Sequence, residues 1–258
     1  MSLDLWIRMA TSEIEDSPNE VCIRNIILEL LLNNNLDYPV YHYLEAQSHN
    51  VSIWKSLVLI HKIFQKGPYS FLNTSYAKLA FFDHIKNKLE DDIYRPLILY
   101  YVDLLKVKIK FHYYYPVCGR DYNRDTSFVV NYQKRMSILI MLLGLQDSVL
   151  TLGLETLKLN DNLSIMSCWP LILLESQNIH RAFMKHAEFY ILETPYMVTF
   201  TDMMDTFKMQ YDFLKEFYQK LGAKSGLDVE PIPNEFPMEN YPQIVEHLWG
   251  MKSIACKN

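Results

Sequence analysis

The chain has 258 residues, half of them hydrophobic, only seven glycines and a formal net charge of −5 at pH 7. Its length suits one large domain or two small ones, and its composition suits a chain that is mostly helix and mostly packed. The negative charge provides no overall basic field, so nonspecific nucleic-acid binding is excluded as a leading function.

Cysteine usage and hydropathy indicate the compartment. The four cysteines show no C-x-x-C pair and no clustering with histidine, which fits reduced thiols better than a disulfide framework or a zinc site. The N-terminus has no basic segment before an apolar run, and the longest apolar run, Ser137–Leu145, is too short to span a bilayer. We expect a soluble, cytoplasmic protein. The cysteines are Cys22, Cys118, Cys168 and Cys256.

The first two helices have clear boundaries. Leu3–Ala10 is a short amphipathic segment with its apolar residues on one face. A strong start signal follows: Ser17 as N-cap, Pro18 at the first helical position and Glu20 closing a capping box. This second helix is predicted to run to about Leu32 and to end in a polar run.

The segment Trp54–Leu72, WKSLVLIHKIFQKGPYSFL, carries the strongest pattern in the chain. Its apolar residues recur at helical spacing and lead directly into Gly67-Pro68. Glycine can adopt the left-handed C′ conformation that ends many helices, and proline cannot continue a helix. The pattern predicts a buried helix, a tight corner and a second helix.

The remaining chain reads as consecutive helices joined by short turns. From Gly222 onward periodicity is lost and prolines accumulate, which predicts an extended Pro-rich tail over 222–258. We therefore expect one all-α domain over 1–258, in which residues 1–221 form a right-handed superhelical solenoid of about eight to ten helices. The further predicted helices lie near 38–47, 51–66, 71–90, 93–114, 126–145, 147–158, 163–192 and 199–221.

Several segments together resemble a known family. Trp54–Leu72 resembles the signature helix pair of ANTH domains, the helical modules of endocytic clathrin adaptors. Lys106–Pro116 and Phe200–Leu221 resemble the long-helix exit and the late helix of the huntingtin-interacting-protein and yeast Sla-type adaptors, and Pro231–Pro237 resembles their Pro-rich segment. The order and spacing of these segments agree across nearly the whole chain.

The resemblance implies an endocytic adaptor module that binds phosphatidylinositol 4,5-bisphosphate membranes and acts with other endocytic adaptor proteins. It also implies links to clathrin and actin through regions outside this chain, and a peripheral location at endocytic membrane sites. The alternative is a protein-binding scaffold of the ENTH/VHS type that no longer binds phosphoinositide.

The family's lipid motif is mostly absent. That motif is a lysine, nine intervening residues and then a Lys-x-Lys/Arg-His/Tyr group near the start of the second helix. Here Arg8 aligns with the first lysine, whereas Pro18, Asn19, Glu20 and Val21 replace the rest. Acidic residues outnumber basic residues, six to two, over residues 4–29. Because each basic residue contributes roughly 1 kcal/mol at an anionic surface, we expect the inherited site to be lost.

Other cations could hold a headgroup. Lys62 and Lys66 lie one turn apart, with Lys55 about one turn back along the same polar face, and with Arg8 they are the candidate lipid-headgroup residues. A solvated helix face would show the same pattern. The three lysines of Lys106–Lys110 likewise predict a solvated face, and Trp6 is either a membrane wedge or packed on neighbouring helices.

No catalytic site, metal site or cofactor is expected. All-helical prenyl-transfer enzymes need an Asp-Asp-x-x-Asp set for Mg²⁺, but Glu90-Asp91-Asp92 has no third aspartate at the required step. His61 lies on the apolar face and is interpreted as a core histidine. Tyr113–Tyr115 form the densest aromatic cluster, in which three consecutive residues cannot all face inward; they fill the core or grip a partner.

Overall fold

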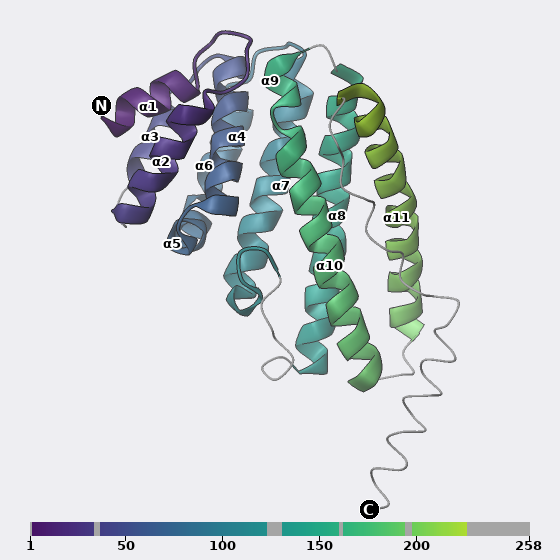
Figure 1. The fold of residues 1–258 in the computed structure, drawn as a ribbon. Helices are drawn as coiled ribbons and strands as arrows, with labels where there is room; N and C mark the ends of the chain where they lie inside the picture. The colour runs from purple at the N-terminus through teal and green to yellow at the C-terminus, as the bar shows by residue number, and fades with distance from the viewer. Residues whose placement is uncertain (1, 34–36, 123–130, 160–161, 194–197, 226–258) are drawn as a thin grey trace, which may run out of the picture.

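The protein is a stack of helices arranged as a solenoid (Figure 1). The computed structural model describes residues 2–33, 37–122, 131–159, 162–193 and 198–225, and every regular element within these ranges is a helix. The predicted all-α superhelical solenoid is therefore confirmed. The α-helices are α1 Leu3–Ala10, α2 Glu20–Leu32, α3 Asp37–Glu45, α4 Asn50–Lys66, α5 Tyr69–Thr74, α6 Leu79–Lys86, α7 Tyr94–Tyr114, α8 Tyr132–Thr156, α9 Leu163–Met166, α10 Trp169–Glu193 and α11 Val198–Ser225, with 3₁₀ turns η1 Ser75–Lys78, η2 Pro116–Cys118 and η3 Leu157–Leu159.

Helix α4 is the most deeply buried part of the N-terminal half. Its apolar residues from Ile53 to Phe64 are at most 1% exposed, as its sequence pattern predicts. Trp54 donates its indole N–H to the carbonyl oxygen of Ser164 at 2.9 Å, which ties α4 to α9. A helix enclosed on several sides fixes the positions of the few polar side chains that reach its surface.

The start of α2 differs from the prediction. Asn19, not Ser17, is the N-cap: its side-chain oxygen accepts the N–H of Cys22 at 3.1 Å. The Ser17 hydroxyl instead donates to the carbonyl oxygen of Leu163. Glu20 forms an ion pair with Lys62 of α4. The capping-box prediction was wrong because tertiary partners compete for the same side chains.

Gly67 ends α4 without the predicted left-handed conformation. Its φ of −80° and ψ of −171° are extended, the region imposed on a residue that precedes proline. Glycine is needed here for close approach, since a Cβ would lie 2.7 Å from the carbonyl oxygen of Ile63. The helix, corner and helix prediction holds, but for a different physical reason.

Two predicted helices are interrupted. The segment 71–90 forms α5, η1 and α6, because the hydroxyls of Thr74 and Ser75 both donate back to the carbonyl oxygen of Phe71 and tighten the turn. The segment 163–192 divides into α9 and α10, because Pro170 lacks an N–H and cannot continue a helix from the preceding turn.

The predicted break near Gln146 is absent, and α8 is continuous. The part of the predicted 126–145 helix before Asn131 lies outside the described residues, and Asn131 caps α8 by accepting the N–H of Lys134 at 3.0 Å. Within the stretch Gln133–Leu159 an 18-residue window has a mean hydropathy of 1.8, so this helix is, by length and composition, able to cross a membrane. More than half of its apolar window (56%) is buried, since α8 packs against α7, α10 and α11 as a core helix does (Figure 1).

The end of the helical region also differs slightly from the prediction. Helix α11 continues past Leu221 to Ser225. The predicted Pro-rich tail from residue 226 onward lies outside the described residues, as do Pro231–Pro237, and the tail remains a prediction.

The two glycines of α8 provide a matched test of how this helix packs against α10 and α11. A Cβ at Gly153 would lie 2.8 Å from Cε2 of Phe217 and 3.2 Å from Cγ2 of Ile172, where α8, α10 and α11 meet. A Cβ at Gly144 would meet nothing within 4 Å. We expect Gly153→Ala to lower the free energy of unfolding by about 1–3 kcal/mol through overpacking. Gly144→Ala should raise it by roughly 0.5–1 kcal/mol through helix propensity. Thermal unfolding followed by circular dichroism distinguishes them, and equal effects would contradict the packing described.

Candidate functional site

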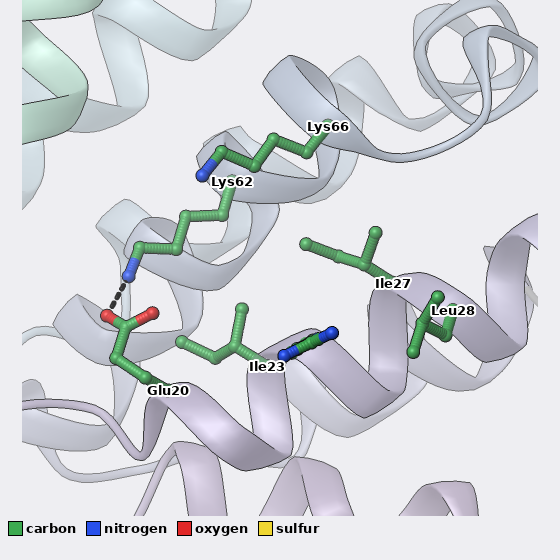
Figure 2. Close-up of a pocket in the computed structure, with 7 residues that line it drawn as sticks. Glu20, Ile23, Ile27, Leu28, Lys62 and Lys66 are labelled. Carbon is green, nitrogen blue, oxygen red and sulfur yellow. Dashed lines mark hydrogen bonds and ion pairs between the residues drawn. The ribbon is translucent and has the colours of Figure 1, made fainter.

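Helices α2 and α4 enclose a groove of about 390 Å³ at the N-terminal end of the solenoid (Figure 2). The apolar side chains on its wall come from α2, and the lysines come from the last turns of α4. The groove therefore combines an apolar wall with cations drawn from two helices. Its lining residues are Glu20, Ile23, Arg24, Ile27, Leu28, Lys62 and Lys66.

Lys62 and Lys66 occupy the exposed edge of an otherwise buried helix. Spaced by four residues, they lie one above the other on the same face of α4. Lys62 is largely covered and forms an ion pair with Glu20, whereas Lys66 is exposed (Figure 2). The structure thus brings together two of the four predicted headgroup residues.

Arg24 is the third cation of the groove and is not among the headgroup residues predicted from the sequence. It lies on α2, 38 positions before Lys62 in the chain, so no sequence spacing connects the two residues. The signal available in the sequence was a single basic residue within the largely apolar segment that forms α2. The groove lining also holds one carboxylate, that of Glu20, which pairs with Lys62.

Arg8 lies outside this groove. Its side chain is exposed, and its guanidinium carbon lies 5.8 Å from the ring centroid of Tyr43. This distance suits a cation–π contact between α1 and α3. The predicted headgroup residues therefore do not form a single cluster.

Lys55 is buried rather than solvent-facing. Its side chain is 0% exposed, and its ammonium donates to the carbonyl oxygen of Ile14 and to Asp16 Oδ1, both at 2.6 Å. Ser12 Oγ accepts a third, longer contact at 3.5 Å. Lys55 holds the α1–α2 connection against α4. The expectation that it shares a polar face with Lys62 and Lys66 was wrong, because this connection covers that turn of the helix.

The three lysines of α7 differ in their exposure to solvent. Lys106 pairs with Asp83 at 2.5 Å, and Lys110 is exposed, as expected of a solvated face. Lys108 is 0% exposed and forms an ion pair with Glu175 of α10, which is also buried. The prediction of a solvated face was wrong for Lys108, because α10 packs over this side of α7.

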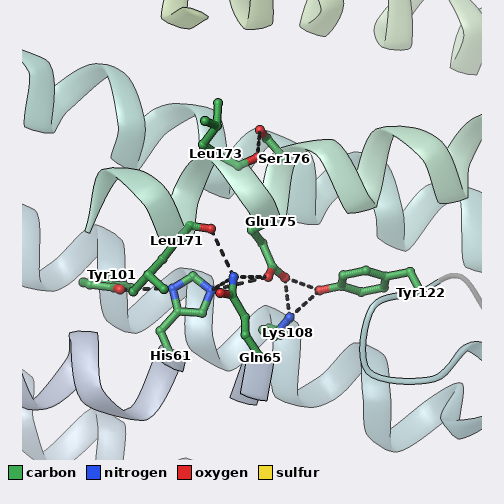
Figure 3. Close-up of polar contacts among 9 residues, drawn as sticks. All are labelled: His61, Gln65, Tyr101, Lys108, Tyr122, Leu171, Leu173, Glu175 and Ser176. Carbon is green, nitrogen blue, oxygen red and sulfur yellow. Dashed lines mark hydrogen bonds and ion pairs between the residues drawn. The ribbon is translucent and has the colours of Figure 1, made fainter. Parts of the chain in front are cut away.

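Glu175 is the hub of a buried polar network (Figure 3). Its carboxylate accepts from Lys108 Nζ, from the Tyr122 hydroxyl and from Gln65 Nε2, the last at 3.0 Å. The Lys108 ammonium also donates to the Tyr122 oxygen at 2.9 Å. Burial acts to raise the pKa of Glu175, but the charge of Lys108 and the hydrogen bond from His61 outweigh it, so the pKa lies well below its usual value. Glu175 is therefore a buried carboxylate.

His61 is a core histidine that belongs to this network, as its position on the apolar face predicts. Its Nε2 lies 3.4 Å from Glu175 Oε2, and its Nδ1 lies 3.0 Å from the Tyr101 hydroxyl. Because a carboxylate only accepts, Nε2 carries the proton and Nδ1 accepts from Tyr101. Burial lowers the pKa of His61 despite the neighbouring carboxylate, so the ring is neutral.

The acidic and aromatic candidates have structural roles. Asp92 Oδ1 accepts the N–H groups of Tyr94 and Arg95 and caps the start of α7. In the part of the chain that the structure describes, no three histidine, cysteine or acidic side chains are placed to share a metal ion.

Trp6 is half-buried against the core. Tyr113 and Tyr114 are exposed and Tyr115 is half-buried, so this cluster does not face inward as a whole.

Solved structures share this fold. One is described as the ENTH domain from epsin-2 in complex with phosphatidylinositol 4,5-bisphosphate; it is 20% identical, has a TM-score of 0.80, and the match covers 90% of this chain and 96% of that one. Another is the endocytic adaptor complex AENTH, at 18% identity and a TM-score of 0.69, covering 91% of this chain and 100% of that one. At these identities the likeness shows the fold alone.

Sequence comparison identifies the family. No curated protein sequence matches this chain significantly. The family model of the ANTH domain matches residues 2–234, nearly the whole chain. This match agrees with the helical solenoid and with its structural neighbours. The chain belongs to the ANTH domain family.

Proposed function

We propose that this chain is an endocytic adaptor module that attaches to anionic membranes by holding a phosphoinositide headgroup in the α2–α4 groove. The observation that carries the proposal is the convergence of Arg24, Lys62 and Lys66 on one groove. Several cations on rigid helices suit a multiply phosphorylated ring, because each phosphate oxygen accepts charge-assisted hydrogen bonds. The structural neighbour described with phosphatidylinositol 4,5-bisphosphate supports the choice of ligand.

The groove is a different site from the one that the family's lipid motif would form. The positions that align with that motif are Arg8 and Pro18 to Val21, and of these Arg8 is the one that keeps a cation. In the groove, binding depends instead on α4 and on Arg24 of α2. Glu20 opposes headgroup binding, because its carboxylate forms an ion pair with Lys62 and repels a phosphate.

Co-sedimentation with phosphatidylcholine vesicles, with and without a few mole per cent of phosphatidylinositol 4,5-bisphosphate, tests the site. We expect Lys66→Glu to lower the partition coefficient about 30-fold, because it removes one cation and adds one anion at roughly 1 kcal/mol each. Lys110→Glu is the matched control, since Lys110 is an exposed lysine of α7 outside the groove. Arg8→Glu tests the family motif. If Arg8→Glu abolishes vesicle binding and Lys66→Glu does not, the headgroup site lies on α1 and the groove proposal is overturned.

Glu20→Gln is expected to act in the opposite direction. It removes the carboxylate that pairs with Lys62 while keeping the size of the side chain. We expect about fivefold tighter vesicle binding, equivalent to roughly 1 kcal/mol, and a steeper dependence on salt. Weaker binding would show that the pair positions Lys62 for the ligand.

The second candidate is a protein-binding scaffold that no longer binds phosphoinositide. The acidic excess over residues 4–29 and the carboxylate in the groove favour it. A neighbour described as an endocytic adaptor complex shows that this fold occurs in protein assemblies. Absence of vesicle binding by the unmodified chain would select this alternative.

The remaining assignments follow from the family and from the notable segments of the sequence. We propose membership of the huntingtin-interacting-protein and Sla-type branch, a cytoplasmic location at endocytic membranes, and partnership with other endocytic adaptors. Links to clathrin and actin would run through regions outside this chain. An adaptor of this kind has no catalytic role.

A further inference from the structure

The outer face of α2 is apolar and exposed. Val21, Leu28, Leu31 and Leu32 are 69%, 47%, 48% and 79% exposed. They recur at intervals of three, four and seven residues, so they form one stripe along the helix. Arg24 is the charged residue within that stripe. A helix at the surface of a soluble domain ordinarily presents polar residues there, so this face is suited to binding an apolar surface.

The packing of α2 leaves this stripe uncovered by the described helices. Helices α1 and α4 contact the opposite side, where Ile23, Ile26 and Leu30 are at most 2% exposed. Figure 1 shows α2 near the N-terminal end of the solenoid, away from the long helices α7 to α11. The stripe continues into the α2–α4 groove, because Leu28 and Arg24 belong to both.

Charge favours a membrane as the surface that the stripe contacts. Arg24 lies within the stripe, and Lys62 and Lys66 line the groove beside it. Helix α2 itself carries two carboxylates, Glu20, which pairs with Lys62, and Glu29, which accepts a hydrogen bond from Asn33. The carboxylates of the α1–α2 connection precede the first residue of α2. A helix of this length spans about 20 Å, so Leu31 and Leu32 lie farther from the carboxylates of the α1–α2 connection than the screening length of about 8 Å at physiological salt. Leucines beside cations match the interface of an anionic bilayer, where apolar side chains enter the acyl boundary and cations stay among phosphates.

We propose that the outer face of α2 enters the interfacial region of an anionic membrane, with Leu28, Leu31 and Leu32 inserted beside the headgroup held in the groove. This inference rests on the proposed function for the identity of the membrane, but it assigns binding to a different set of side chains. It predicts two contributions to binding: a salt-sensitive one from the cations and a salt-resistant one from the leucines.

The partition coefficient of L31S/L32S on phosphatidylinositol 4,5-bisphosphate vesicles tests the stripe. We expect a fall of about tenfold that persists when salt is raised from about 0.1 M to about 0.5 M, because apolar transfer is not screened. The effect of Lys66→Glu should shrink over the same range. I140S/M209S is the matched control, since Ile140 and Met209 are 57% and 58% exposed on α8 and α11. Circular dichroism confirms that each variant is folded.

Insertion can be measured directly. Cysteine in place of Leu32, in a Cys256→Ser background, gives a labelling position, since the described cysteines are buried. We expect an environment-sensitive fluorophore at position 32 to shift to the blue on vesicles and to be quenched by lipids brominated in the acyl chain. The same label at position 140 should do neither.

The two proposals fail separately. If L31S/L32S binds like the unmodified chain and the label at position 32 is not quenched, while Lys66→Glu still loses binding, the stripe proposal is overturned and the groove stands. If L31S/L32S alters only self-association, the stripe is a protein contact and this inference is also overturned. If the unmodified chain binds no vesicles, both proposals fall.

Discussion

Replacing Glu175 by leucine is expected to lower the free energy of unfolding by about 3–5 kcal/mol, the range found when one partner of a buried ion pair is removed. The substitution leaves the Lys108 ammonium, itself 0% exposed, without its opposite charge. It also removes the acceptor used by Gln65 and Tyr122. Urea unfolding followed by circular dichroism gives the free energy directly.

A second variant separates the charge from the lost packing. The double variant K108M/E175L removes both charges together, and we expect it to recover at least about 2 kcal/mol relative to E175L, because buried ion pairs are often replaceable by apolar residues of similar volume. Gln65 and Tyr122 still lose an acceptor, so recovery should be incomplete. If E175L were as stable as the unmodified protein, the network would not contribute to the stability of the solenoid.

Acidification is expected to destabilise the fold between about pH 6.5 and pH 4. Burial, reinforced by the charges of Arg135 and Lys185, lowers the pKa of His186 from 6.5 to about 4. Burial also lowers the pKa of His61, and it holds that of His112 well below its ordinary value. All three imidazoles are neutral in the folded protein, whereas the unfolded chain takes up a proton at each near its ordinary pKa.

The direction of this pH effect on the free energy of unfolding follows from the number of protons that each state binds. Between about pH 6.5 and pH 4 the unfolded state binds more protons than the folded state, so stability is fully present above this window and is lost as the pH falls through it. His186 alone accounts for a loss on the order of 3 kcal/mol across the window, and His61 and His112 add to it in the same direction. Urea unfolding at half-unit pH intervals measures the slope.

His186→Gln provides the control for this prediction. The amide does not titrate, so the variant should be less stable near neutral pH but should show a shallower slope between about pH 6 and pH 5, by roughly 1.4 kcal/mol per pH unit. The ring nitrogen Nε2 of His186 lies 4.0 Å from Cys118 Sγ. An unchanged slope would assign the acid sensitivity to other groups.

Much of the fold follows from local patterns. The apolar periodicity of Trp54–Leu72 and the Gly67-Pro68 pair predict the buried helix α4 and the corner after it, since burial at helical spacing and a proline stop depend on neighbouring residues alone. The errors have two sources. A distant partner changes the role of Ser17, which bonds to Leu163 instead of capping α2. A local hydrogen bond that apolar periodicity does not reveal divides the predicted helix 71–90, where hydroxyls bond back to the carbonyl oxygen of Phe71.

The polar sites depend more strongly on tertiary structure. Sequence spacing gives the helix face on which Lys55, Lys62 and Lys108 lie, but not what packs over that face. The α1–α2 connection covers Lys55, and α10 brings Glu175 to Lys108 across 67 positions of the chain. Lys62 and Lys66 were candidates from their spacing, whereas their grouping with Arg24 exists only because α2 packs beside α4.

The sequence by itself determined that this protein is an all-helical solenoid of the ANTH type. Periodicity, corner residues and motif letters are local properties, which the chain carries whether or not it is folded. Only the tertiary structure decided which lysines are buried and which reach solvent. A charge is stable in the core only where its partner is delivered by another helix, and Glu175 and Asp16 are such partners for Lys108 and Lys55.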